Sequence, residues 1–203
     1  VKPLFNKNFA FEKHRTRRKV FRKLRRHLKK YFICAIINIS VKITHLHRKG
    51  MGKTVNKLAI VINGRGGVGK DTLCEFAAKH YRTINISTID PIKKIASENG
   101  WNGEKTPRAR RFLSELKQVF SDYNDLPTVY AVNAYKSFLE SDNELMFIHI
   151  REAGQIKHFL KRASPYGGRI VTLLVRSRRV RKSYGNSSDD EVENYRYDYS
   201  FQN

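Results

Sequence analysis

Runs of consecutive apolar residues alternate along the chain with stretches in which apolar residues recur every three or four positions. The runs predict buried strands at residues 57–63 and 145–150. Further strands are predicted at 83–89 and 169–175, and a fifth at 197–201. The helical spacing predicts helices at 71–82, 91–98, 107–123, 127–139 and 152–163. Strands that alternate with helices favour a parallel sheet with right-handed crossovers. The pattern therefore predicts an α/β fold of three layers, in which helices flank a five-stranded parallel sheet.

Two of the predicted helices begin with a polar residue followed by proline. Asp90 precedes Pro91, and Thr106 precedes Pro107; a capping side chain and a proline at the first helical position are both typical of helix starts. In the second of these helices, one stripe of apolar residues predicts a face turned to the core: Phe112, Leu116, Val119, Phe120 and Tyr123.

Charge divides the chain into two parts. The chain has 203 residues, 41 of them basic and 18 acidic, for a net charge of +23. Sixteen of the basic residues and one acid lie in residues 1–50, a net charge of +15, which leaves +8 for the remainder. The two cysteines, Cys34 and Cys74, have no metal-ligand spacing and suit a reducing compartment. We therefore expect a cytoplasmic protein.

The basic region 1–50 has three interpretations. A basic arm would bind nucleic-acid phosphates, and a basic segment before the apolar run 31–41 would be a signal peptide or a membrane-surface anchor. That run is too short to span a bilayer, which needs about 20 residues, so we expect no stable membrane insertion. The third interpretation, which we prefer, is that residues 1–50 do not belong to the working protein and that a P-loop domain covers residues 51–203, with Met51 as the start.

The most informative motif lies between the first predicted strand and the first predicted helix. Residues 64–72 read GRGGVGKDT, which fits the phosphate-loop pattern G-x-x-x-x-G-K. Glycines let successive backbone amides turn toward a phosphate chain, and the helix N-terminus adds partial positive charge. Lys70 would reach the β- and γ-phosphates. Asp71 stands where Ser or Thr usually ligates Mg²⁺, and a carboxylate is also a good Mg²⁺ ligand.

The segment Gly69-Lys70-Asp71-Thr72 resembles the phosphate loop of phage deoxynucleoside monophosphate kinases, within the adenylate-kinase-like group of P-loop kinases. The resemblance extends over roughly residue 57 to the last residue. Four more segments are similar to parts of that family: 87–93 to the segment after the second strand, 106–113 to the arginine-bearing helix that holds the acceptor phosphate, 147–151 to the third strand, and 198–203 to the last strand.

The resemblance implies a P-loop kinase fold and transfer of a phosphoryl group from ATP, with Mg²⁺, to a (deoxy)nucleoside monophosphate. It implies a donor site made of Gly64, Arg65, Gly66, Gly67, Val68, Gly69, Lys70, Asp71 and Thr72, with Asp71 as the metal ligand. Asp90, Lys93, Arg108 and Arg111 are the expected acceptor-binding residues. Lys70, Arg151 and Arg176 are the expected catalytic residues; Arg176 belongs to the arginines that follow the strand 169–175, where related kinases carry a lid.

Charge placement supports part of this assignment without the resemblance. Phosphoryl transfer requires cations around both the donor and the acceptor phosphate. Arg108 and Arg111 lie about one helical turn apart, and Arg151 follows a buried strand at the rim where open α/β sheets bind ligands. Each arginine is alternatively an ordinary solvated charge, and Asp90 is alternatively only a helix cap.

The sequence departs from the family at two places. His149 stands where the family has an aspartate, and we interpret it as a hydrogen-bonded strand residue. The sequence also ends at Asn203, before the segment that helps hold adenine and the final helix of the family.

Two further hypotheses stay open beside the kinase. A P-loop ATPase or nucleic-acid-associated protein would use the basic surface, although a hydrolase normally ends a strand in acidic residues and residues 145–150 lead instead into Arg151. A catalytically impaired nucleotide-binding protein would explain Asp71. Small nucleotide substrates are the expected partners, nucleic acid is the less favoured one, and the sequence does not indicate an oligomeric state.

Overall fold

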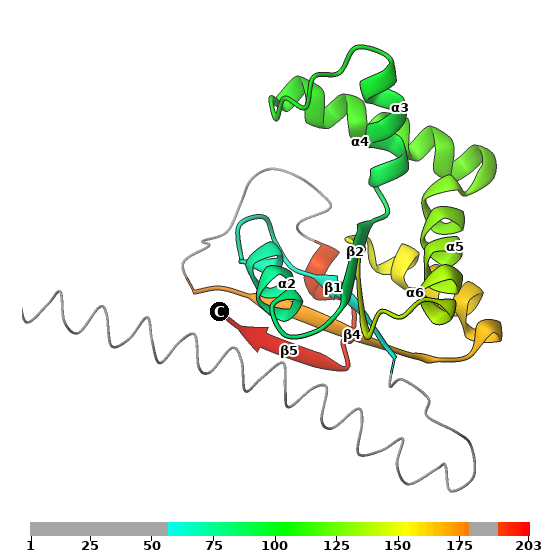
Figure 1. Ribbon diagram of the computed structural model, residues 1–203. Coiled ribbons are helices and arrows are strands. Elements are labelled where there is room, and N and C mark those ends of the chain that lie inside the picture. Colours follow the sequence, from blue (N-terminus) through cyan, green and yellow to red (C-terminus); the bar gives the residue numbers. More distant parts are fainter. Residues whose placement is uncertain (1–56, 179–190) are drawn as a thin grey trace, which may run out of the picture. The chain divides into compact units, whose positions relative to one another are not determined.

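A parallel sheet forms the centre of the protein. The structure, a computed structural model, describes residues 57–178 and 191–203 (Figure 1). Its strands are β1 (Leu58–Asn63), β2 (Thr83–Ser87), β3 (Leu145–His149), β4 (Arg169–Arg176) and β5 (Tyr199–Gln202). They pair in the order β2-β3-β1-β4-β5, and all four pairings are parallel. The predicted fold class and all five predicted strands are confirmed.

Helices lie on both faces of the sheet (Figure 1). They are α2 (Lys70–Ala78), α3 (Asp90–Glu98), α4 (Pro107–Asn124), α5 (Leu126–Glu140) and α6 (Ala153–Ala163), with the 3₁₀ helices η1 (Ser164–Tyr166) and η2 (Glu191–Asn194). On one face, Ala59 and Val61 of β1 pack into a fully buried cluster with Tyr135, Phe138 and Phe159 of α5 and α6. The side chains of β1 alternate between faces, so Ile60 and Ile62 point to the opposite face, which α2 covers.

Local hydrogen bonds set the starts of α3 and α4, and α3 begins one residue earlier than predicted. The Thr106 hydroxyl accepts a hydrogen bond from the Ala109 amide at 3.2 Å, so the predicted cap of α4 is confirmed. Asp90, predicted as the cap of α3, is instead the first helical residue, and Ile89 is the capping position. The Asp90 carboxylate still stabilises the turn, because it accepts a hydrogen bond from the Ser87 amide at 2.6 Å.

The predicted core stripe of α4 is wrong. Phe112, Val119 and Tyr123 are 42%, 61% and 83% exposed, and the buried residues of the helix are Ala109 and Lys117. The reason is that α3 and α4 extend beyond the carboxyl end of β2 and pack mainly on each other and on α5 (Figure 1). A helical period reveals an apolar face, but it does not reveal whether another element covers that face.

One sequence-based expectation concerns a segment that the structure does not describe. The predicted basic region 1–50 lies outside the described residues. Among residues 57–178 and 191–203, no helix has both the length and the apolar character needed to cross a membrane.

Candidate functional site

The loop between β1 and α2 has the backbone geometry of a tight glycine-rich turn. Gly64 and Gly69 have φ values of +143° and +96°. A Cβ atom at Gly64 would lie 2.3 Å from the backbone oxygen of Val175 in β4, and one at Gly69 would lie 2.4 Å from Nδ2 of Asn203. Both positions therefore require glycine, for conformation and for close approach. The loop therefore packs closely against β4 on one side and against Asn203 on the other.

Lys70 begins α2, as a phosphate-loop lysine should. Its Nζ atom donates hydrogen bonds to the carbonyl oxygens of Gly64 and Arg65, at 2.5 Å and 2.9 Å. The ammonium group therefore stays within the loop, next to the amino end of α2, where the helix dipole also favours an anion. Asp71 and Thr72 follow it in the first turn and are exposed.

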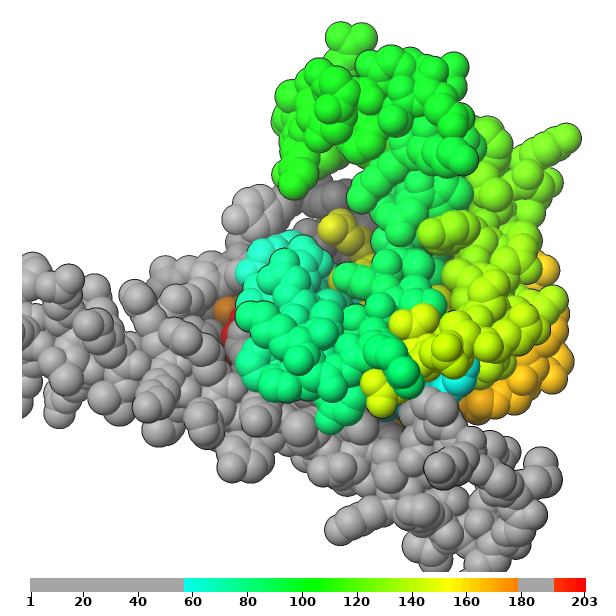
Figure 2. Space-filling view, viewed as in Figure 1, coloured from blue at the N-terminus to red at the C-terminus, as the bar shows by residue number. Residues whose placement is uncertain are grey.

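A cleft of about 840 Å³ opens beside the loop, at the carboxyl edge of the sheet. The hollow between α2 and the arm formed by α3 and α4 is visible in Figure 2. Its walls include the loop, the ends of β1, β2 and β3, and the inner sides of α3 and α4. Six basic and four acidic side chains line it: Lys70, Lys93, Lys105, Arg110, Lys117 and Arg151, and Asp71, Asp90, Glu104 and Glu152. Strands that diverge on either side of β1 create such a crevice in open α/β sheets.

The cleft unites five of the charged residues that the sequence singled out, together with Gly66 and Gly67 of the loop. Lys70 and Asp71 come from the loop side, Asp90 and Lys93 from α3, and Arg151 from the segment after β3. Lys70 brings positive charge to the loop end of the cleft, Lys93 brings it to the wall formed by α3, and Arg151 brings it to the end of β3.

Arg108 and Arg111, the predicted acceptor clamp, do not line the cleft, whereas Arg110 does. Arg110 is spaced four and seven residues from Ser114 and Lys117, which also line the cleft, so these three side chains share the inner side of α4. Arg108 and Arg111 are exposed and belong to other sides of the helix. The arginine of this helix that lies at the cleft is therefore Arg110, and the acceptor-binding role of Arg108 and Arg111 stays a prediction.

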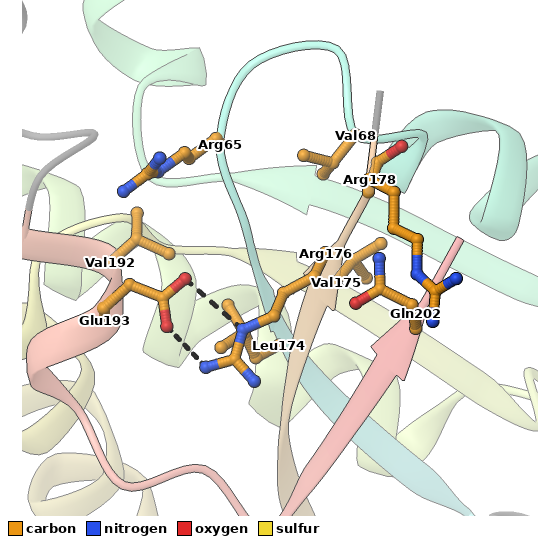
Figure 3. Close-up of a pocket in the computed structure, with 10 residues that line it drawn as sticks. Arg65, Val68, Leu174, Val175, Arg176, Arg178, Val192, Glu193 and Gln202 are labelled. Carbon is orange, nitrogen blue, oxygen red and sulfur yellow. Dashed lines mark hydrogen bonds and ion pairs between the residues drawn. The ribbon is translucent and has the colours of Figure 1, made fainter. Parts of the chain in front are cut away.

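Arg176 also lies apart from the cleft. It ends β4 and forms an ion pair with Glu193 of η2: its Nε atom lies 3.3 Å from Oε1, and its Nη2 atom contacts Oε2. The hydrogen bond from Arg176 lowers the pKa of the Glu193 carboxyl, and the same bond raises the pKa of Arg176. Both side chains border a smaller hollow of about 200 Å³ (Figure 3).

This smaller hollow borders the glycine-rich loop from the side of β4 and β5. Arg65 and Val68 of the loop form one part of its wall (Figure 3). The rest of the lining comes from β4, the residues after it, η2 and β5: Leu174, Val175, Arg176, Ser177, Arg178, Val192, Glu193 and Gln202. The hollow thus combines an apolar floor with guanidinium groups, which stack on planar aromatic rings.

Asn63 was missed by the sequence analysis. It ends β1 with no exposed surface, its Oδ1 atom accepts a hydrogen bond from the Gly64 amide at 2.7 Å, and its Nδ2 atom donates to the Arg151 carbonyl at 2.8 Å. Nδ2 also donates to the Tyr197 hydroxyl at 2.7 Å. The sequence carried one available signal, which is that a polar residue ends an otherwise fully apolar strand.

Lys117 was likewise not predicted, because the apolar stripe of α4 indicated that another side of the helix faces the core. Its Nζ atom lies 2.8 Å from Oε2 of Glu152, and the two side chains are 11% and 28% exposed. The ion pair joins α4 to the segment that leaves β3. Removing one partner of so buried a pair would leave an uncompensated charge.

His149 is held as a neutral hydrogen-bonding group. Its Nε2 atom lies 2.8 Å from Oδ1 of Asn85 and 3.8 Å from Sγ of Cys74. Burial lowers the pKa of His149, so the ring is neutral at neutral pH, and the contact with the amide oxygen places the proton on Nε2. Burial also raises the pKa of the Cys74 thiol to about 12, so the pair is not an activated thiolate. This agrees with the interpretation of His149 as a hydrogen-bonded strand residue.

The acidic residues of the site suit a metal ion that the protein and the substrate phosphates bind together, rather than one that the protein binds alone. Within residues 57–178 and 191–203, no group of three or more His, Cys, Asp or Glu side chains is placed to hold a metal. Mg²⁺ in phosphoryl-transfer sites keeps several waters and takes one or two carboxylates plus substrate phosphates. The exposed carboxylate of Asp71, in the first turn of α2 and in the cleft wall, fits that requirement.

Comparison with known proteins gives limited information. No protein-family model matches the sequence, and no curated protein matches it. Among solved structures, a candidate kinase from Chloroflexus aurantiacus aligns at a TM-score of 0.39 and 14% identity, over 62% of this chain and 62% of that one. The protein TT1252 from Thermus thermophilus aligns at a TM-score of 0.41 and 19% identity, over 73% of this chain and 89% of that one.

The aligned region spans less than two thirds of the Chloroflexus protein. Both TM-scores lie below 0.5.

Proposed function

We propose that this protein is an ATP-dependent phosphotransferase whose acceptor is a (deoxy)nucleoside monophosphate. The observation that carries the proposal is that one cleft joins the phosphate loop with Lys70 to a second set of cations from outside the loop: Lys93 of α3, Arg110 of α4 and Arg151 after β3. A phosphoryl group that moves between two phosphates needs positive charge on both sides of its path.

The donor end of the proposal rests on the loop. Its amides and Lys70 would hold the β- and γ-phosphates, and Asp71 would hold Mg²⁺, which supplies charge neutralisation between those phosphates. The small hollow in Figure 3 lies across the loop from the cleft and suits the nucleoside end of ATP, because it offers planar guanidinium groups and apolar surface: Arg65 lies beside Val192, and Arg178 lies beside Gln202. A triphosphate wrapped by the loop would then direct its γ-phosphate into the cleft.

Arg176 does not enter this mechanism. Its guanidinium is engaged by Glu193 on the side of the loop that holds the small hollow, so it is not aimed at the transferring group. Arg151 and Arg110 take the role that the sequence analysis gave to Arg176 and to the clamp Arg108 and Arg111.

The acceptor end of the proposal rests on α3, α4 and the segment between them. Lys93 and Arg110 would bind the acceptor phosphate. Trp101 borders the same cleft, and its Nε1 atom donates to the Glu104 carbonyl at 3.2 Å, which fixes the ring. A fixed aromatic ring near a phosphate site favours an acceptor with a planar base. The cleft volume of about 840 Å³ lies within the range of small-molecule sites, about 300–1,000 Å³.

The end of β3 supports transfer to an acceptor rather than to water. A hydrolase needs a carboxylate there to orient the attacking water and the metal. Glu152, the nearest carboxylate of that segment, is instead paired with Lys117 at 2.8 Å. Arg151 beside it supplies a cation to the cleft, as a phosphate acceptor requires.

The proposal is tested with the full chain, labelled ATP, Mg²⁺ and a panel of nucleoside monophosphates. We expect one or more labelled diphosphates, and we expect Lys70→Ala to lower the transfer rate by roughly 10²–10³-fold, because the group that follows the migrating charge is lost. Lys79→Ala, which removes an exposed lysine just after α2, is the matched control and should leave the rate unchanged. Equal rates for wild type and Lys70→Ala, or release of free phosphate without transfer, would contradict the proposal.

A further inference from the structure

Asn63 occupies the point at which β1 passes into the phosphate loop. It is one of five polar residues that are buried in the described part of the chain, and it has no exposed surface. An apolar residue would continue β1 equally well, because Leu58 to Ile62 are all apolar. The strand itself therefore does not require an amide side chain at this position.

The hydrogen bonds of Asn63 join the two functional ends of the cleft. Its Oδ1 atom caps the amide of Gly64, the first residue of the phosphate loop, at 2.7 Å. Its Nδ2 atom holds the backbone carbonyl of Arg151 at 2.8 Å, although the two residues are 88 positions apart in the sequence. One planar, rigid amide thus fixes the start of the donor loop and the backbone of the acceptor-side arginine relative to each other.

The sheet register explains why this contact forms. β1 and β3 are neighbours, and Ile62 is paired with His149. β3 ends at His149, whereas β1 continues by one residue to Asn63, which still pairs with Leu174 of β4. The side chain of Asn63 therefore lies beside the segment that leaves β3 and reaches the backbone of Arg151. The second donor of Nδ2 goes to Tyr197, whose hydroxyl in turn donates to the Val192 carbonyl at 3.0 Å.

We infer that Asn63 is a positioning residue that holds Arg151 in register with the phosphate loop and so sets the reach of the guanidinium across the cleft. The effect expected on kcat rests on the proposed function, whereas the effect expected on the backbone of Gly64 and Arg151 does not. Phosphoryl transfer is sensitive to such placement, because a shift of about 1 Å in a positioned group can lower a rate by about 10²-fold.

The kinetic test is a double-mutant cycle between Asn63 and Arg151 in the full chain. We expect Asn63→Ala to lower kcat by roughly 10–100-fold, as Arg151→Ala does, because either change removes the placed cation from the reaction. In the Arg151→Ala background, Asn63→Ala should lower kcat further by less than about threefold, because there is no guanidinium left to place. Effects that multiply in the double variant would overturn the inference.

Two variants separate positioning from general stability. Tyr197→Phe removes one of the three hydrogen bonds of Asn63 but leaves both bonds that join the loop to Arg151, and Tyr197 lines neither hollow. We expect it to melt at a lower temperature and to keep wild-type kcat. If Asn63→Ala fails to fold, Asn63→Asp replaces it in the cycle, because the carboxylate keeps the acceptor for the Gly64 amide and lacks the amide donor for the Arg151 carbonyl.

A spectroscopic readout tests the inference even if wild type transfers no phosphate, in which case only the proposed function fails. The amide nitrogen of Glu152 is bonded to the carbonyl of Arg151, so its chemical shift reports the hydrogen bond from Asn63. We expect Asn63→Ala to shift this nitrogen resonance and to speed hydrogen exchange at Gly64, while Tyr197→Phe leaves both unchanged. A Glu152 resonance and a Gly64 exchange rate that match wild type in Asn63→Ala would overturn the inference.

Discussion

Gly64 offers the sharpest test of how tightly the phosphate loop is packed. The change Gly64→Ala adds a Cβ atom that would lie 2.3 Å from the backbone oxygen of Val175. Ordinary van der Waals contact for a Cβ atom begins at 3.4 Å, so either the loop or β4 must move by about 1 Å. The obstacle is a backbone atom of a central strand, which cannot rotate away as a side chain can.

Two terms give the expected loss of stability. The φ of +143° costs alanine about 1–2 kcal/mol, because the Cβ atom disfavours positive φ. Overpacking against β4 costs about 1–3 kcal/mol more. The free energy of unfolding should therefore fall by about 2–5 kcal/mol, a large part of the roughly 5–15 kcal/mol that stabilises a typical domain.

Gly67→Ala is the matched control within the same loop. Gly67 also has a positive φ, +73°, but a Cβ atom there would meet nothing within 4 Å. It should lose only the conformational term, about 1–2 kcal/mol. Equilibrium urea unfolding, followed by circular dichroism, measures both variants. Equal losses for Gly64→Ala and Gly67→Ala would refute the close approach of loop and strand.

Two other changes test the core and the cleft. The ring of Tyr135 is fully buried, and its hydroxyl donates a hydrogen bond to the Gly167 carbonyl at 2.6 Å. Tyr135→Phe removes this hydroxyl and should lower the free energy of urea unfolding by about 1–2 kcal/mol. An unchanged free energy of unfolding would show that the bond is absent in solution. Burial lowers the pKa of His149 below its ordinary value of 6.5, so the unfolded chain gains a proton that the folded chain does not as pH falls below 6.5. The stability that neutral His149 contributes above pH 6.5 is therefore lost on acidification, and His149→Gln should lose less stability than wild type between pH 7.5 and 5.5; identical pH profiles would contradict this assignment.

The order and type of the elements were predictable because each depends on neighbouring residues. Largely apolar runs predicted β1, β3 and β4, since a strand buried on both faces needs apolar residues at nearly every position. β2 and β5 carry polar residues at every second position. The cap at Thr106 and the loop at 64–72 were also local, because a side chain that caps its own helix and a glycine that turns its own backbone act within a few residues.

The composition of the cleft was only partly predictable. Lys70 and Asp71 were found because the motif that contains them is contiguous, and Arg151 was found because the end of a buried strand lies at the ligand edge. The sequence did not show that Arg110, rather than Arg108 or Arg111, lines the cleft, because two arginines one turn apart can share any side of a helix. Spacing alone does not set the rotation of that helix about its axis.

Sequence alone thus determined the strands, the helices and the glycine-rich loop 64–69, whose geometry is encoded by its own glycines and by the start of α2. Tertiary structure decided which side of α4 faces the cleft, that Arg176 pairs with Glu193, and that Lys117 meets Glu152 across 35 residues of sequence. It also decided that Asn63 joins the loop to Arg151, 88 residues away. Such contacts depend on how whole elements pack, and a buried polar side chain finds its partner only after the sheet has set the register between strands.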